Sequence, residues 1–203
     1  MDGHGIKLLF PLPGNNAKPI RFFYYQLYAH HIFLNGPLFY FCRNEILMNN
    51  EIQSIIRNLE ITLDGEPWFG RSVYAILGEI DGSLVYTKPN SNSHSLVELL
   101  YHSLTWAEFT LKRIERDDIN DLAAFEKLDW REIDPQIHGW EEGLAAFIAA
   151  HQQIIALLHT KQDSFLEEKV DFRNYNFRFL LNGLIQHNIY HLGQMAYLRK
   201  LLS

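Results

Sequence analysis

The sequence LLNGLIQHNIYHLGQMAYLRKLL, residues 180–202, predicts the larger part of one long helix that begins near Asn174. Its apolar residues recur at intervals of three and four, so they lie on one face of a helix. His187 and His191 are four residues apart and project from that same face, one turn from each other. Two imidazoles at this spacing can bind one metal ion. Because the shared face points to the core, the pair predicts a buried metal site.

Three other long segments show the same helical periodicity. We expect helices over residues 49–63, 95–113 and 139–158. Trp68, Val73, Ile76 and Leu77 predict a short further helix that ends before Asp81 and Gly82. Ser95 and Glu98 form a capping box that begins the second long helix. Residues 115–135 are acidic and at most briefly helical, and only residues 83–87 alternate as a strand would. Four long amphipathic helices joined by loops of unequal length predict an all-α fold, a four-helix bundle.

The composition limits the classes of function. The chain has 203 residues and 47% hydrophobic content, which suits one globular domain with a sizeable core. Its formal net charge is -6 and its lysines and arginines form no cluster, so the sequence does not predict binding to duplex nucleic acid. Cys42 is the single cysteine, which excludes an intrachain disulfide and leaves little for a thiolate metal site. A reducing compartment fits this cysteine usage, so we expect a cytoplasmic protein.

Residues 1–47 differ from the rest of the chain. They are rich in aromatic residues and show no sustained periodicity. Prolines interrupt the early apolar run, so a signal peptide is not predicted, and polar residues within 22–42 argue against a membrane span. Two interpretations stay open: an artefact of start-site choice, with Met48 as the true start, or an appended docking segment. Residues 48–203 are expected to form the bundle domain.

A third histidine extends the predicted site. His102 lies on the apolar face of the second long helix, and a buried neutral histidine is costly unless its ring nitrogens find partners. Three neutral imidazoles with one open position are typical of a catalytic metal site, and zinc or nickel would suit them. His151 faces inward on the third helix and is interpreted as a proton shuttle or a core residue rather than a fourth ligand. The chain has ten histidines, however, so ordinary buried histidines bonded to backbone or water are the alternative.

Several neighbours are candidates for lining the pocket or orienting the ligands, although the sequence singles out no catalytic residue. Gln194 can hydrogen-bond to a metal-bound imidazole. Trp106, one turn after His102, is expected to wall the pocket. Tyr190 points away from the pair and is expected to meet a neighbouring helix. Glu98 could accept a hydrogen bond from His102, although the capping box also requires it.

The chain from about Ile52 onward resembles the DinB/YfiT-like superfamily of small four-helix-bundle proteins. The resemblance rests on LDGEPWFGRSVYAIL (63–77), SHSLVELLYHSLTWAEF (93–109), the pair Asp129 and Trp130, AHQQIIALL (150–158), and IQHNIYHLGQ (185–194) followed by LRK. It implies a bundle in which His102, His187 and His191 bind a divalent metal. It also implies a homodimer. Relatives that are bacillithiol transferases or mycothiol-dependent isomerases imply a low-molecular-weight thiol as cosubstrate.

Three hypotheses of function follow from these observations. The leading one is a metal-dependent enzyme, a thiol S-transferase or a related hydrolase, in which the metal lowers the pKa of a bound thiol. The second is a non-catalytic stress-response protein that binds a metal or another ligand. The third is a purely structural bundle, which predicts that chelators leave the melting temperature unchanged. An enzyme of this kind is expected to take a small-molecule substrate and to bind neither nucleic acid nor membrane.

Overall fold

The structure, a computed structural model, describes residues 50–117 and 121–203. The secondary-structure elements within these ranges are all helical. Four α-helices are long: α2 (Asn50–Asp64), α4 (Leu96–Ile114), α6 (Trp140–Leu158) and α7 (Phe177–Leu202). The short elements are the α-helices α3 (Val73–Leu77) and α5 (Leu122–Leu128) and the 3-10 segments η1 (Gly82–Leu84) and η2 (Asp163–Glu167). The predicted all-α fold is confirmed. The predicted N-terminal extension, residues 1–47, lies outside the described residues.

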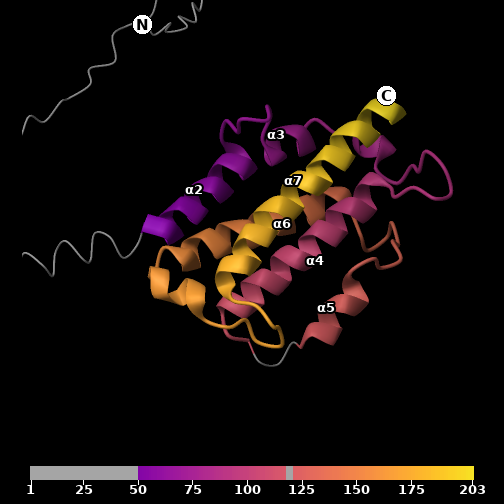
Figure 1. Cartoon of the computed structure of the whole chain (residues 1–203). Coiled ribbons are helices and arrows are strands. Elements are labelled where there is room, and N and C mark those ends of the chain that lie inside the picture. The colour runs from indigo at the N-terminus through magenta and orange to yellow at the C-terminus, as the bar shows by residue number, and fades with distance from the viewer. Residues whose placement is uncertain (1–49, 118–120) are drawn as a thin grey trace, which may run out of the picture. The chain divides into compact units, whose positions relative to one another are not determined.

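The four long helices pack in a closed ring (Figure 1). Helix α4 packs against α6 and α7, and α2 packs against the same two helices, so the order around the ring is α2, α6, α4, α7. Helices α4 and α7 run in opposite directions. Leu99 near the start of α4 lines one pocket with Leu198 near the end of α7, whereas Thr110 lines another with Leu180. This is the arrangement of a four-helix bundle, and it sets the first half of α4 beside the second half of α7.

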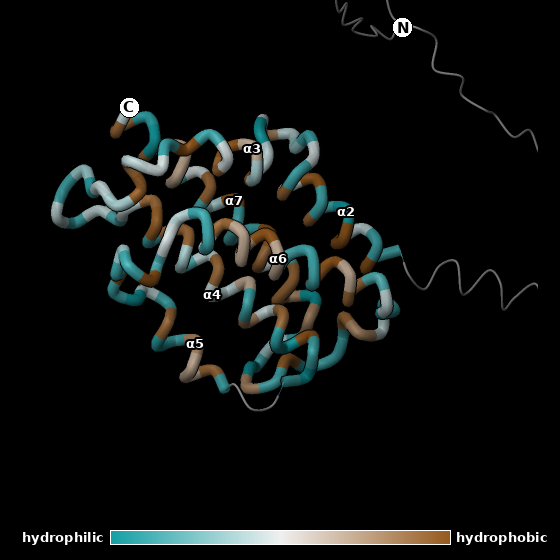
Figure 2. The backbone as a smooth tube through the Cα atoms, turned by 180° about the vertical axis from the view of Figure 1, so that it is seen from behind, coloured by the Kyte–Doolittle hydropathy of each residue, from teal (hydrophilic) through white to brown (hydrophobic). Residues whose placement is uncertain are grey.

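The core is formed by the apolar face of each long helix. Figure 2 shows hydrophobic residues recurring along these helices, with hydrophilic residues between them. All four helices contribute fully buried side chains: Leu59 from α2, Phe109 from α4, Phe147 from α6 and Phe177 from α7. Burying one side chain of this size stabilises the fold by about 1.5–3 kcal/mol. Histidines that the periodicity places on these faces are therefore buried among large apolar side chains.

Hydrogen-bonded caps fix where helices α4 and α7 begin. The Ser95 hydroxyl accepts a hydrogen bond from the backbone N–H of Glu98 at 3.3 Å, and the Glu98 carboxylate accepts one from the backbone N–H of Ser95 at 2.7 Å. The predicted capping box is therefore confirmed. Asn176 caps α7, because its side-chain oxygen accepts from the backbone N–H of Phe179 at 3.1 Å. The caps set the register of the residues that follow on both helices.

The connection between α3 and α4 contains no strand. Residues 83–87 alternate as a strand would, but they form part of η1 and a turn. The carbonyl of Val85 accepts from the backbone N–H of Val97 at 3.0 Å, so the start of α4, and not a second strand, is the hydrogen-bonding partner of this segment. Within the described part of the acidic stretch 115–135, the one short helix is α5, as expected. Across residues 50–117 and 121–203, no helix combines the length and the hydrophobicity that crossing a bilayer requires.

Candidate metal centre

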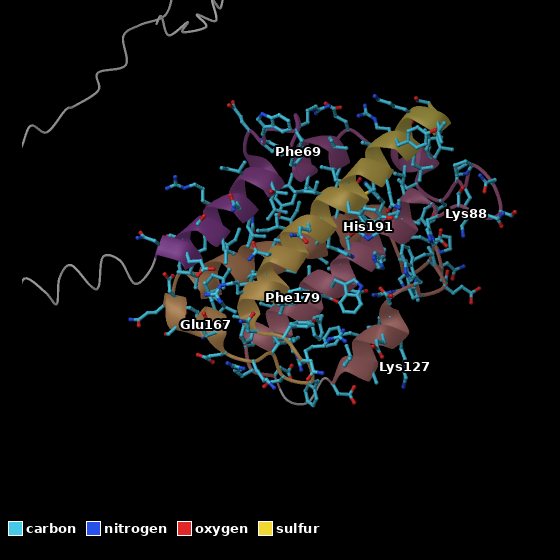
Figure 3. The ribbon with its side chains drawn as sticks, in the orientation of Figure 1. Phe69, Lys88, Lys127, Glu167, Phe179 and His191 are labelled. Carbon is cyan, nitrogen blue, oxygen red and sulfur yellow. The ribbon has the colours of Figure 1, made fainter. Side chains whose placement is uncertain are left out.

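Three histidine rings from two helices meet inside the bundle. His102 comes from the second turn of α4, and His187 and His191 come from successive turns of α7. Nε2 of His102 lies 2.9 Å from Nε2 of His191 and 3.0 Å from Nε2 of His187. His102 and His191 are buried, and His187 is half-buried. Figure 3 labels His191 where α7 lies against α4. The helical spacing thus brings the three predicted residues together.

The outer nitrogens of two of these rings lie beside acceptors. Nδ1 of His191 lies 2.6 Å from Oε1 of Gln194. Nδ1 of His102 lies 2.7 Å from Oδ1 of Asp129, although this close contact lacks the ideal angle of a hydrogen bond. A carboxylate and an amide oxygen offer only lone pairs, so both rings carry their hydrogen on Nδ1. Their Nε2 atoms therefore direct lone pairs toward each other.

Two lone pairs that face each other at this distance repel unless a cation lies between them. A proton is disfavoured, because burial, together with neighbouring imidazoles, lowers the pKa of His187 to about 3 and that of His191 to about 4. Burial also lowers the pKa of His102, against the opposing effect of Asp129. Nitrogens that share one zinc-sized ion at about 2.1 Å lie roughly 3.0–3.4 Å apart. The three-histidine cluster could therefore bind a divalent metal ion.

Comparison with known proteins places this site in a family. The sequence profile of the DinB superfamily matches residues 70–195, which is more than half of the chain. The chain belongs to the DinB superfamily. No curated protein matches the sequence. In this DinB-superfamily protein the matched span contains all three clustered histidines, whereas helix α2 precedes it.

Asp129 reaches the cluster of this DinB-superfamily protein from the end of the short helix α5. Arg131 ties that end to α4, since its Nε donates to the carbonyl of Leu128 at 2.9 Å and its Nη2 donates to the hydroxyl of Thr105. Nε1 of Trp106 donates to Oδ1 of Asp129 at 2.6 Å. The carboxylate is therefore held between an indole N–H and the α4 histidine. Carboxylates in this position fix the orientation of a metal-binding imidazole and increase its basicity.

Periodicity and spacing gave neither Asp129 nor Trp130 a place beside the histidines. The Trp130 ring stacks on His102 with ring centroids 3.8 Å apart, and on its other face it stacks on His94 at 4.0 Å. Trp130 is 45% exposed, so it covers the cluster from the solvent side. Both residues lie in a stretch without periodicity. Their place in the motifs of the DinB resemblance was the one sequence signal that could have marked them.

The other predicted neighbours lie close to the cluster but differ in what they contact. Gln194 is beside His191, as expected. The expectation that Tyr190 meets a neighbouring helix is wrong: Tyr190 is 64% exposed, and its hydroxyl accepts from Nε2 of Gln194 at 3.4 Å. Glu98 is engaged in the capping box and with Nζ of Lys88 at 2.6 Å. A different carboxylate therefore lies beside the α4 histidine.

His151 is fully buried on α6 and is not available to a metal in this conformation. Its Nδ1 lies 2.8 Å from the carbonyl oxygen of Phe147, and its Nε2 lies 2.9 Å from Nδ2 of Asn188. Both ring nitrogens of His151 are therefore in hydrogen-bond contact with protein groups. No fourth histidine, cysteine or carboxylate joins the cluster within the described ranges.

An apolar pocket of about 160 Å³ reaches the cluster between α4 and α7. His187 lines the pocket, and Trp106 lines it in the position that the helical spacing predicts. Because His187, a partly exposed histidine of the cluster, forms part of its wall, a small molecule in this pocket would lie beside the cluster. The pocket is the feature that distinguishes this arrangement from a closed structural site.

Replacing Asp129 with alanine is expected to weaken the affinity for zinc by about 10- to 100-fold, because the carboxylate that orients His102 is lost. Competition with a chromophoric chelator measures this affinity. Glu132→Ala is the matched control, since Glu132 is an exposed acidic residue of the same loop. Equal affinities for the two variants would contradict an orienting role for Asp129.

Proposed function

We propose that this protein is a metal-dependent enzyme that activates a small-molecule thiol, either as a thiol S-transferase or as a related hydrolase. The observation that supports it most directly is the convergence of three Nε2 atoms, from His102, His187 and His191, beside an apolar pocket. A structural site would need a fourth protein ligand, and none is present among the described residues. An open position next to a pocket favours chemistry on a bound molecule.

The residues around the cluster have separate parts in this proposal. His102, His187 and His191 would hold zinc or nickel, which suit imidazole ligands. Asp129 and Gln194 keep the hydrogens of two rings on Nδ1, so that Nε2 stays free to coordinate. When bound, the metal supplies a lowered pKa for a thiol or a water at the open position.

Two further groups favour such chemistry in a dry site. Trp130 stacks on the cluster and limits the access of water from that side. The pocket wall beside His187 is mostly apolar, and it includes Leu180 and Leu184. A charged nucleophile is stronger when it is poorly hydrated, so an apolar surround suits attack by a thiolate on an electrophile.

The test combines metal analysis with a thiol assay on the full-length protein. We expect freshly purified protein to contain stoichiometric zinc or nickel and to conjugate cysteine or glutathione to monochlorobimane. His187→Ala should lose both properties. His159→Ala should keep both, because His159 is exposed at the end of α6. Protein that contains no metal, or a His187→Ala variant with unchanged metal content, would contradict the proposal.

Metal binding without thiol conjugation would instead support the non-catalytic alternative, a metal- or ligand-binding stress-response protein. The homodimer implied by the family resemblance is also part of our proposal, and light scattering on the purified protein tests it. A cytoplasmic location stays a prediction from cysteine usage.

A further inference from the structure

The pocket beside the cluster is long and has a chemically distinct far end. His187 and Phe179 both line it, and they are eight residues apart on α7, about 12 Å along the helix axis. Figure 3 labels Phe179 on the part of α7 that leads away from His191. Thr110 of α4 and Tyr175, which precedes α7, lie at this far end. The pocket therefore extends from the histidine cluster toward the start of α7.

Arg173 packs against two aromatic walls of the pocket, although it is not itself one of the lining residues. Its guanidinium carbon is 5.9 Å from the ring centroid of Trp106 and 5.9 Å from that of Tyr175, both of which line the pocket. It is also 5.4 Å from the ring centroid of Phe109. Burial raises the pKa of Tyr175, and the adjacent Arg173 opposes that effect, which places the cation near the phenol hydroxyl.

Unlike Arg178 and Arg116, Arg173 has no carboxylate partner within residues 50–117 and 121–203. Arg178 pairs with Glu51 and with Glu167, and Arg116 pairs with Glu168. By contrast, Nε of Arg173 is buried without a hydrogen-bond partner. A guanidinium held against apolar rings without an anion is well placed to bind the anion of a ligand.

The segment that carries Arg173 is itself fixed. An isolated β-bridge joins Lys169 to Asn176, and the N–H of Val170 donates to the carbonyl of Tyr175 at 3.0 Å. The bridge closes a short loop whose tip holds the arginine just before α7 begins. An anion would therefore meet a cation whose backbone is already in place, which reduces the ordering cost of binding.

We propose that this pocket binds a small carboxylate whose apolar body of about six to eight carbons fills the space between α4 and α7. The carboxylate lies at Arg173 and the Tyr175 hydroxyl, and the opposite end of the molecule faces His187. The volume of about 160 Å³ suits a body of this size, since an apolar cavity of roughly 150 Å³ accommodates benzene. The inference rests on the proposed function only for the chemistry at the histidine end.

The first test compares a charged ligand with its neutral isostere. Calorimetric titration of the full-length protein, after removal of metal by chelator, uses 3-phenylpropionate and 3-phenylpropanamide. We expect the carboxylate to bind roughly tenfold more tightly, because charge-assisted hydrogen bonds to a guanidinium are strong. Arg173→Gln should abolish this preference. Arg57→Gln should retain it, since Arg57 is exposed on α2, a helix that contributes nothing to the pocket lining.

The second test fills the pocket with a matched pair of glycine substitutions. Gly183 and Gly193 both lie within α7, and a Cβ added at either meets no atom within 4 Å. Only Gly183 lines the pocket. Gly183→Leu should abolish binding of both probes, whereas Gly193→Leu should leave binding unchanged while gaining the same helix propensity.

Either of two results would overturn the inference. One is equal affinity for the carboxylate and the amide in the wild-type protein, and the other is unchanged binding in Gly183→Leu. Because the titrations use metal-free protein, a carboxylate that binds only after metal is restored also counts against a role for Arg173. Metal content and thiol conjugation are measured separately. A negative result in these titrations therefore does not contradict the proposed function, and a negative result in the metal and thiol assays does not contradict carboxylate binding.

Discussion

Removing the metal with a chelator is expected to lower the melting temperature of the wild-type protein by roughly 10 °C relative to protein in excess metal. A ligand that binds only the folded state at about 1,000 times its Kd stabilises that state by about 4 kcal/mol. For a chain of this size, each kcal/mol shifts the melting temperature by about 2–4 °C. The effect follows from the geometry, since one ion would join α4, through His102, to α7, through His187 and His191.

The variant His102→Ala separates this stabilisation from other effects of the chelator. His102 is the one ligand candidate on α4, so its removal deletes the connection between the two helices while both α7 histidines remain. We expect the melting temperature of His102→Ala to be nearly the same with and without metal. His159→Ala should show the full wild-type shift. If the chelator leaves the melting temperature of the wild-type protein unchanged, the interpretation as a purely structural bundle is favoured instead.

The fold and the three-histidine cluster could be predicted from sequence because both depend on helical periodicity. Apolar residues at intervals of three and four place whole faces of α4 and α7 in the core, whatever the partner helix is. His102, His187 and His191 occupy those faces, so all three rings point into the shared core, and the antiparallel packing of α4 on α7 then brings them to the same level. The Ser95 capping box similarly depends on residues three apart within one segment.

The surroundings of the cluster could not be predicted in this way, because they depend on tertiary contacts. Asp129 reaches His102 only because Arg131 fixes the end of α5 against α4. Trp130 covers the cluster only because the chain turns back after α5. No periodicity within residues 115–135 encodes either contact. The expectation for Tyr190 failed for a related reason, since spacing gives the direction of a side chain but not whether another helix lies there.

His151 could be assigned to the interior from its spacing, but its partners lie on two different helices. Nδ1 contacts the carbonyl of Phe147, one turn earlier on α6, whereas Nε2 contacts Asn188 on α7. A carbonyl only accepts, so Nδ1 carries the hydrogen and Nε2 accepts from the Asn188 amide. The neutral ring is therefore satisfied on both sides. A second ring hydrogen would face the amide hydrogens of Asn188 in a site without solvent.

This arrangement is expected to make folding sensitive to acid. Burial lowers the pKa of His151 to about 4, whereas a histidine in the unfolded chain titrates near 6.5. Below pH ~6.5 the unfolded state takes up a proton that the folded state does not bind, so the contribution of His151 is complete above that pH and is lost as pH falls toward 4. The loss from this one residue is about 3 kcal/mol.

The variant His151→Leu is expected to be less stable than wild type at pH 7, by about 1–3 kcal/mol, because Asn188 loses its partner. Its stability should nevertheless fall less between pH 7 and pH 4, by about 3 kcal/mol, since leucine does not titrate. Urea denaturation of chelator-treated proteins at both pH values measures the two differences. Chelation matters because the pKa values of His187 and His191 are also lowered, mainly by burial, and in metal-free samples this contribution is similar in both proteins.

The exposed His159 provides the control for this experiment. His159→Leu removes a histidine from the end of α6 without removing a buried ring, so it should keep the wild-type dependence on pH. If the stability of His151→Leu instead follows wild type in parallel from pH 7 to pH 4, the buried ring does not resist protonation. A proton could then reach His151, and the proton-shuttle role considered from the sequence would become the better interpretation than a core residue held neutral by Phe147 and Asn188.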